Sequence, residues 1–191
     1  MKRLHYLVFA LLAVCALQQG LFALDVPQLK SRVNDYAGMI SEETEQTLEA
    51  RLAEFEQTDS TQLVILTVSS LEGDSLEEFS IRTASQWELG QKGRDNGILL
   101  LVSKGDRLSR IEVGRGLEGR LTDLFAGRII DLIMNPLFKA GRFDDGFTAA
   151  VDALIMAVKG EFTADDVQSA YSDGDAEGLS FGFMVLLLFF G

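Results

Sequence analysis

Cysteine, histidine and proline are almost absent from this chain of 191 residues. The one cysteine is Cys15 and the one histidine is His5, and both lie near the start of the chain. The remainder therefore has no thiol and no imidazole, which excludes disulfides, cysteine nucleophiles, serine–histidine–aspartate triads and zinc sites with cysteine or histidine ligands. Any chemistry there must use carboxylates, hydroxyls, lysine, arginine, backbone groups or a hard cation held by oxygen atoms.

Basic residues are also scarce, with 17 Lys and Arg against 29 Asp and Glu and a formal net charge of -12. Binding to nucleic acid requires a basic face that neutralises phosphates, so this balance argues against a general nucleic-acid partner. It is compatible with binding cations. The length and the 47% hydrophobic content predict one globular domain with appended segments.

The first 23 residues have the pattern of a signal peptide. A short basic start is followed by the apolar run Leu4–Leu17, and Ala23 offers a small residue at a cleavage point. Lipidation at Cys15 and retention as an uncleaved anchor are the alternatives, and ordinary export is favoured. Cleavage would remove Lys2 and Arg3 but no acid, leaving 15 basic residues and a formal charge of -14. This pattern predicts an extracytoplasmic location, in the periplasm or at the cell surface.

The other end of the chain predicts a membrane anchor. Residues 161–178 are acidic and poor in large apolar side chains, as in a linker. Residues 179–191 are strongly apolar but shorter than the roughly 20 residues that cross a bilayer. We interpret them as the start of a transmembrane segment, with a tail packed on the domain as the alternative.

Residues 24–160 predict one α/β domain. Two apolar, β-branched runs are typical of buried strands, and a short turn after the second predicts an antiparallel hairpin. Between and after them, caps and helical spacing of apolar residues indicate helices. The expected fold is a three-layer α/β/α sandwich with a small mixed sheet. The expected strands are 62–68, 97–103 and 108–113. Two helices are expected to begin at Ser41 and at Ser75. A third begins at Thr122 or Asp123 and ends at Asn135-Pro136, and a fourth runs from about Asp144 to Val158, before Gly160.

The run Gly114–Gly119 fits the GxGxxG pattern that is found in dinucleotide-binding loops. The preceding strand comes from a hairpin and not from a βαβ unit, and Glu118 would repel a pyrophosphate, so we expect no nucleotide. Two interpretations remain. The glycines permit a tight passage from strand to helix, or the loop presents backbone amides to an anion or positions a metal ligand.

Carboxylates from separate loops are expected to meet near this run. Hairpin geometry brings Asp95 beside the glycine loop, with Asp123 just beyond it, and paired carboxylates in a cleft attract a proton or a cation. Ca²⁺ or Mg²⁺ is the natural partner for oxygen ligands alone, and Asp35 is a possible third ligand. The alternative is a purely structural role, in which these residues form turns and helix caps and bind no ion.

At these residues the chain resembles the TPM domain family, including the YgcG-like bacterial proteins. The resemblance covers about residues 28–160 and rests on motifs that occur in family-like order. They are Val33-Asn34-Asp35-Tyr36-Ala37, Arg94-Asp95-Asn96-Gly97-Ile98-Leu99-Leu100, Arg110–Gly119, Leu121-Thr122-Asp123 and Pro136–Gly146.

The resemblance implies an α/β/α sandwich that is often exported and followed by a transmembrane helix. It also implies Ca²⁺ or Mg²⁺ binding in an acidic cleft, with Asp95 and Asp123 as ligand candidates and Asp35 as a weaker one. Relatives include a thylakoid-lumen acid phosphatase and photosystem II repair factors, so two functions are open. The first is a cation-dependent binding or quality-control module for a membrane protein or membrane-associated complex. The second is a metal-dependent acid phosphatase.

For the phosphatase, Arg94 or Arg115 would neutralise phosphate charge, because guanidinium groups match phosphate oxygens. Gly116, in the middle of the glycine loop, would contribute a backbone amide to the same anion site. No nucleophile or general base is evident for this reaction, and for that reason the binding module is favoured.

Overall fold

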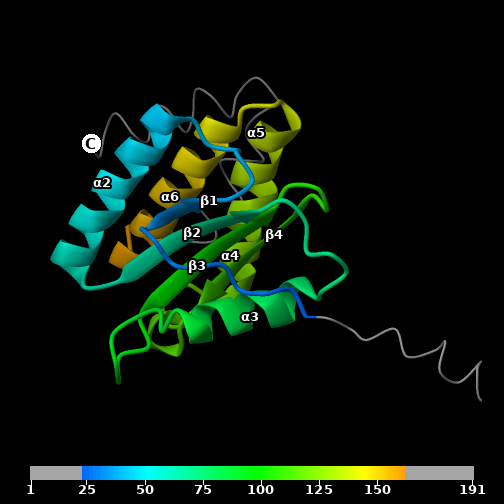
Figure 1. Ribbon diagram of the computed structural model, residues 1–191. Coiled ribbons are helices and arrows are strands. Elements are labelled where there is room, and N and C mark those ends of the chain that lie inside the picture. The colour runs from blue at the N-terminus through cyan, green and yellow to red at the C-terminus, as the bar shows by residue number, and fades with distance from the viewer. Residues whose placement is uncertain (1–22, 162–191) are drawn as a thin grey trace, which may run out of the picture.

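The computed structural model describes residues 23–161, so the predicted signal peptide, most of the acidic linker and the apolar C-terminal run lie outside the described residues. Within the described part, a four-stranded sheet has the order β1-β2-β3-β4. The first three strands are parallel, and β4 is antiparallel to β3. Helices cover both faces, with α2 and α6 on one side and α3 on the other (Figure 1). This confirms the expected α/β/α sandwich with a mixed sheet.

The strands and helices follow the chain in a simple order. The strands are β1 (Val33–Asp35), β2 (Gln62–Val68), β3 (Gly97–Ser103) and β4 (Leu108–Val113). The helices are α2 (Glu42–Asp59), α3 (Leu76–Gln86), α4 (Asp123–Arg128), α5 (Asn135–Lys139) and α6 (Phe143–Lys159), with a 3-10 turn at Arg115–Leu117 and a π-helical turn at Ile129–Met134. None of the helices formed by the described residues is long and apolar enough to cross a membrane.

Local sequence signals explain most of the boundaries. The hydroxyls of Ser41 and Ser75 accept hydrogen bonds from the backbone N–H groups of Thr44 and Glu78, which caps α2 and α3 as predicted. Gly160 has the left-handed backbone conformation that ends α6. Strands β2, β3 and β4 occupy the predicted ranges, and the hairpin of β3 and β4 is antiparallel.

The predicted end of a helix at Asn135-Pro136 is wrong. The helical path that begins at Asp123 continues past Pro136 through the π-helical turn and into α5. Pro136 sits in the first turn of α5, where a missing backbone N–H costs least. The wider π-helical turn before it shifts the hydrogen-bonding partners, so the ring does not break the helical path.

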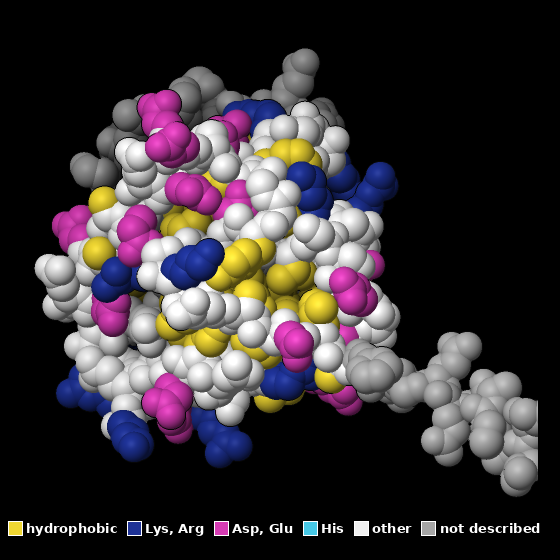
Figure 2. All heavy atoms as spheres, in the orientation of Figure 1, with side chains coloured by type: hydrophobic (Ala, Val, Ile, Leu, Met, Phe, Trp, Pro, Cys, Tyr) yellow, Lys and Arg dark blue, Asp and Glu magenta, His cyan; other side chains and the backbone are white. Residues whose placement is uncertain are grey.

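Two cores of unequal size lie on the two faces of the sheet. The larger one joins α2, α4 and α6 to the side chains of Ile98, Leu100 and Ile111. The smaller one joins α3 to Leu99 and Leu101. In the orientation of Figure 1, hydrophobic side chains gather over the middle of the sheet within a rim of charged ones (Figure 2). Among the described residues, α3 is the one helix on the face of the smaller core, and the chain before β1 packs beside it.

The extended segment 24–29 packs on α3 and adds to the cover of this face. The backbone N–H of Leu24 donates to Asp74 Oδ2 at 2.9 Å, and Trp87 Nε1 donates to the carbonyl of Pro27 at 2.9 Å. Arg82 donates both to the Leu24 carbonyl and to Asp74. Trp87 is buried, as its place on the apolar helical face predicts. These contacts close one side of α3 and leave its other side, toward β4, less covered.

The loop after β4 passes very close to the start of β3. The N–H of Gly114 donates to the Gly97 carbonyl at 2.8 Å, and that of Gly116 donates to the Asp95 carbonyl at 3.0 Å. A Cβ atom on Gly116 would lie 1.9 Å from the Arg94 carbonyl oxygen, and one on Gly114 would lie 2.1 Å from that of Asp95. The glycines therefore permit a close passage of two backbones, which supports the structural interpretation of the GxGxxG pattern.

We predict that Gly116→Ala destabilises the fold by about 1 to 3 kcal/mol, because the added methyl group meets backbone that cannot yield cheaply. Gly119→Ala is the matched control in the same loop, since a Cβ there has nothing within 4 Å. Urea unfolding of both variants measures the difference. Equal stability of the two would contradict the close passage.

Asp152 is a buried acid on α6, and Arg51 of α2 pairs with it at 2.5 Å. Burial raises the pKa of Asp152 above its ordinary value of 3.8, and the attraction to Arg51 only partly opposes this. At pH values between the ordinary pKa and the raised one, Asp152 keeps its proton in the folded state but has lost it in the unfolded state. The contribution of this group to stability therefore falls as the pH rises from the ordinary pKa through the raised one.

We predict that Asp152→Asn removes this pH dependence, so the variant gains stability relative to the unsubstituted protein as the pH rises above the ordinary pKa of 3.8 and through the raised one. Arg51 is 42% exposed and can return to water when its partner is neutral. Asp145→Asn, at an exposed position of the same helix, is the control. Thermal unfolding across this pH range tests the prediction. A gain in stability by the unsubstituted protein relative to the variant would show that the attraction to Arg51 outweighs burial in setting the pKa of Asp152.

Candidate functional site

Asp35 lies at the carboxyl end of β1, where its side chain holds the loop that leads into α2. Its Oδ2 atom accepts hydrogen bonds from the backbone N–H groups of Met39 at 2.7 Å and Ile40 at 2.9 Å. Its Oδ1 atom accepts from the hydroxyl of Thr67 on the neighbouring strand. Both oxygens thus serve the local structure. Asp35 therefore has the turn-forming role that the sequence analysis gave as the alternative to metal binding.

Asp95 lies at the opposite end of the sheet from Asp35. It precedes β3, which runs parallel to β1, and its backbone has the left-handed conformation with φ of 48°. Its approach to the glycine loop is as expected, through the bond from the Gly116 amide. The same bond occupies the Gly116 amide that was a candidate for binding an anion.

Asp123 lies at the first position of α4 and lines a different hollow from Asp95. That hollow is bordered by Glu77 of α3, Ser109 of β4 and Asp131. The three predicted ligands are therefore spread over three places. Within residues 23–161, no three acidic, histidine or cysteine side chains are grouped so that they could hold a metal ion. Since Ca²⁺ takes six to eight oxygens and Mg²⁺ six, the residues do not fit a preformed cage, and the ion stays a prediction from sequence.

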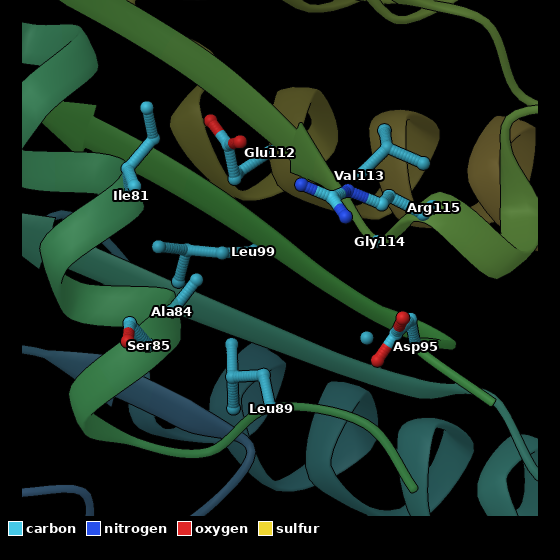
Figure 3. A pocket seen from close by; sticks show the side chains of 11 residues that line it. Ile81, Ala84, Ser85, Leu89, Asp95, Leu99, Glu112, Val113, Gly114 and Arg115 are labelled. Carbon is cyan, nitrogen blue, oxygen red and sulfur yellow. The ribbon is translucent and has the colours of Figure 1, made fainter. Parts of the chain in front are cut away.

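The glycine loop and Asp95 instead border a groove between α3 and the hairpin of β3 and β4. Figure 3 shows side chains from both layers pointing toward this space. The groove encloses about 430 Å³ and is open to solvent. It is lined by Ile81, Ala84, Ser85, Leu89, Asp95, Gly97, Leu99, Glu112, Val113, Gly114 and Arg115.

The base of the groove is apolar. Leu99 of β3 is fully buried beneath it, whereas Ile81 on the outer face of α3 is 49% exposed. Leu89 and Ala84 complete this strip from the side of the helix. An exposed isoleucine beside a solvent-filled groove leaves apolar surface that a ligand could bury. The strip exists because α3 and segment 24–29 cover only part of this face.

Charged groups stand at both ends of the apolar strip. Toward the middle of β4, Glu112 accepts hydrogen bonds from Ser80 at 3.0 Å and from Arg110 at 2.9 Å. Toward the glycine loop, the side chains of Asp95 and Arg115 are exposed, and neither has a partner among the described residues. A ligand with an apolar body and charged groups would find one free acid and one free guanidinium here.

Of the predicted anion-binding residues, only Arg115 lines the groove. Arg94 is exposed, and its contribution is a backbone carbonyl packed against Gly116. The groove residues on α3 were not predicted from the sequence. One signal was present, because Ile81 is a large apolar residue off the inward stripe of Leu76, Phe79 and Thr83. Nothing in the sequence pointed to Ser85 or Glu112.

The groove offers few groups for nucleophilic chemistry. Residues 23–161 contain no histidine and no cysteine. Ser85 is the one hydroxyl side chain among the residues that line the groove, and no hydrogen bond to a described carboxylate activates it. A serine nucleophile requires a base bonded to it, and the carboxylates that line the groove, Asp95 and Glu112, form no hydrogen bond with Ser85.

Comparison with known proteins gives the family. The profile of the TPM domain matches residues 33–157. The solution NMR structure of the N-terminal domain of a protein from P. gingivalis is similar, with 32% identity, a TM-score of 0.64, and coverage of 68% of this chain and 82% of that one. The NMR structure of the BA42 protein from Bizionia argentinensis has 19% identity and a TM-score of 0.55, with 66% of this chain and 88% of that one covered, and shares the fold.

No protein with a curated function matches this chain. The family match spans β1 to the last turn of α6, and so includes every strand and both helical layers. It agrees with the motifs around Asp35, Asp95 and the glycine loop from which the resemblance was drawn. The chain therefore belongs to the TPM domain family.

Proposed function

We propose that this TPM domain is an extracytoplasmic binding module, and that its groove between α3 and the hairpin holds a segment of a membrane protein or membrane-associated complex. The observation that carries this proposal is the apolar strip of exposed Ile81 and half-buried Leu89 beside two unpaired charges, Asp95 and Arg115. The location and the tether are supported by the apolar character of the two ends of the sequence.

The geometry specifies the ligand in part. A large apolar side chain would cover the strip and displace water from it, which contributes about 25 cal/mol for each Å² buried. A carboxylate beyond it would meet Arg115, and an amino or guanidinium group would meet Asp95. Dependence on Ca²⁺ or Mg²⁺ is supported by the sequence pattern and the family resemblance alone, so it enters the experiment as a separate variable.

We predict that a photo-crosslinking amino acid placed at Ser85 in the full chain, expressed in the source organism, forms adducts with a membrane protein. The same amino acid at Glu43, exposed on α2, is the control and should form none. Ile81→Asp and Arg115→Glu should each lower the yield of the adduct about tenfold, because each removes one part of the complementary surface. Mass spectrometry of the isolated adducts identifies the partner.

A chelator added before irradiation tests the cation. Loss of the adduct that Ca²⁺ or Mg²⁺ restores would support cation dependence, and an unchanged yield would remove it from the proposal. Equal adducts from Ser85 and Glu43 would contradict the assignment of the groove.

A metal-dependent acid phosphatase is the second candidate. The observation in its favour is the unpaired guanidinium of Arg115 at the mouth of the groove, since such groups bind phosphate oxygens well. No base among the described residues is bonded to Ser85, the hydroxyl of the groove, and for that reason binding is the better-supported function.

We predict that the purified full chain releases no phosphate from an aryl phosphate above background, with Mg²⁺ or Ca²⁺ present, between weakly acidic and neutral pH. Asp95→Asn and Arg115→Ala should give the same background. A metal-dependent rate that falls about a hundredfold in either variant would establish the phosphatase instead.

A further inference from the structure

The open edge of the sheet at β4 carries a second inference, separate from the groove of Figure 3. Strands β1 and β4 form the two edges. Strand β1 has only three residues, and such short edges are a common protection against unwanted pairing. Strand β4 has six residues and contains no proline. It is the longer edge, and the one at which another strand could add.

The register of the hairpin determines which backbone groups of β4 face outward. Gly114 lies opposite Gly97, one step beyond the pair of Val113 with Ile98, and its N–H donates to the Gly97 carbonyl at 2.8 Å. In an antiparallel ladder, directly bonded and non-bonded pairs alternate. The N–H and C=O groups of Ser109, Ile111 and Val113 therefore point away from β3, and no side chain or loop among residues 23–161 bonds to them.

A hollow lies along part of this edge. It encloses about 340 Å³ and is open to solvent. Its walls come from both layers of the sandwich, with Leu76 and Glu77 of α3 on one side and residues of α4 and the π-helical turn on the other. Ser109, Arg110 and Ile111 of β4 lie between these walls. Small residues, Ala126 and Gly127, line the far wall and leave space beside the strand.

Three acids surround this hollow and one base offsets them. Glu77, Asp123 and Asp131 line it, together with Arg110. Arg110 is already engaged, since its Nε donates to Glu112 at 2.9 Å and its Nη2 lies 3.7 Å from Glu77. Asp123 has no partner within residues 23–161. The net charge of the lining side chains is negative, so a basic occupant is complementary to it.

We propose that the β4 edge binds an extended basic segment of a partner protein by strand addition. The backbone of the segment pairs with Ser109 and with Ile111, whose side chain is buried in the core while the residue borders the hollow. Lysine or arginine side chains at alternate positions reach Asp123 and Asp131. Main-chain hydrogen bonds supply affinity in this mode, and the side chains that alternate along the added strand supply selectivity. The polar bridge of Ser80, Glu112 and Arg110 separates this site from the groove beside Asp95.

The test uses the full chain in mild detergent and a synthetic heptapeptide of alternating lysine and valine. Amide exchange followed by mass spectrometry measures protection of the peptide covering β4, and fluorescence anisotropy of the labelled heptapeptide measures affinity. We expect the heptapeptide to bind and to slow exchange in β4. The same heptapeptide with alternate backbone nitrogens methylated should bind at least about tenfold more weakly, because several strand-pairing bonds are lost.

Charge variants complete the test. Asp123→Lys and Asp131→Lys should each weaken binding about fivefold or more, whereas Glu43→Lys, which changes net charge equally on α2, should have a smaller effect. Equal binding of the methylated heptapeptide, or equal losses in all three variants, would show general attraction to an acidic protein and overturn the proposal. Amides of β4 that bond to β3 exchange slowly in any case, so the outward amides of Ser109 and Ile111 are the ones compared. Slow exchange of these two amides before any heptapeptide is added would show that this edge is already covered, and would overturn the proposal as well.

Discussion

Close backbone contact between residues 94–97 and the loop at Gly114–Gly116 determines how the functional surface is built. The two segments pass with no room for a Cβ atom at either glycine. Their contact fixes the ladder register of the hairpin, because it adds the pair of Gly97 and Gly114 to the end of the strands. It also places Asp95 beside Arg115. The groove and the β4 edge both depend on this register.

The second physical factor is the unequal cover of the two faces of the sheet. Strands β2 and β3 are buried on both faces, as their nearly continuous apolar sequences require. On one face α2, α4 and α6 supply a large core, but on the other α3 works with one extended segment. A single helix cannot fill the width of the sheet, so hollows remain along its flank. Both proposed binding sites lie on that flank, one toward the glycine loop and the other toward α4.

Much of the fold could be predicted from the sequence, and less of the site. Strands β2, β3 and β4 and the caps at Ser41 and Ser75 are local signals of apolar runs and side-chain oxygens. Strand β1 was missed because its three residues pair only with distant β2. The helix was expected to stop at Pro136, and it does not, because a π-helical turn changes the pairing before the ring.

The candidate site shows the same limit. Hairpin geometry correctly brought Asp95 to the glycine loop, but loop acids were expected to gather at one edge. Asp35 lies at the opposite end of the strands from Asp95, and its oxygens accept hydrogen bonds from Met39, Ile40 and Thr67. Which hydrogen bonds a loop carboxylate accepts depends on where the loops turn in space, and spacing along the chain does not specify that. The outer residues of α3 line a groove only because β4 lies beside them, and the sequence does not show this neighbour.

The anchoring of segment 24–29 has a consequence for maturation. The Leu24 amide donates to Asp74, whose pKa is lowered mainly by the bond from Arg82. If a peptidase cuts after Ala23, as the sequence predicts, Leu24 acquires a charged α-amino group beside that carboxylate. A hydrogen bond in which only the acceptor is charged then becomes one between two opposite charges. Processing of the precursor would thus fasten the new chain end onto α3 and reinforce the thinner layer of the sandwich.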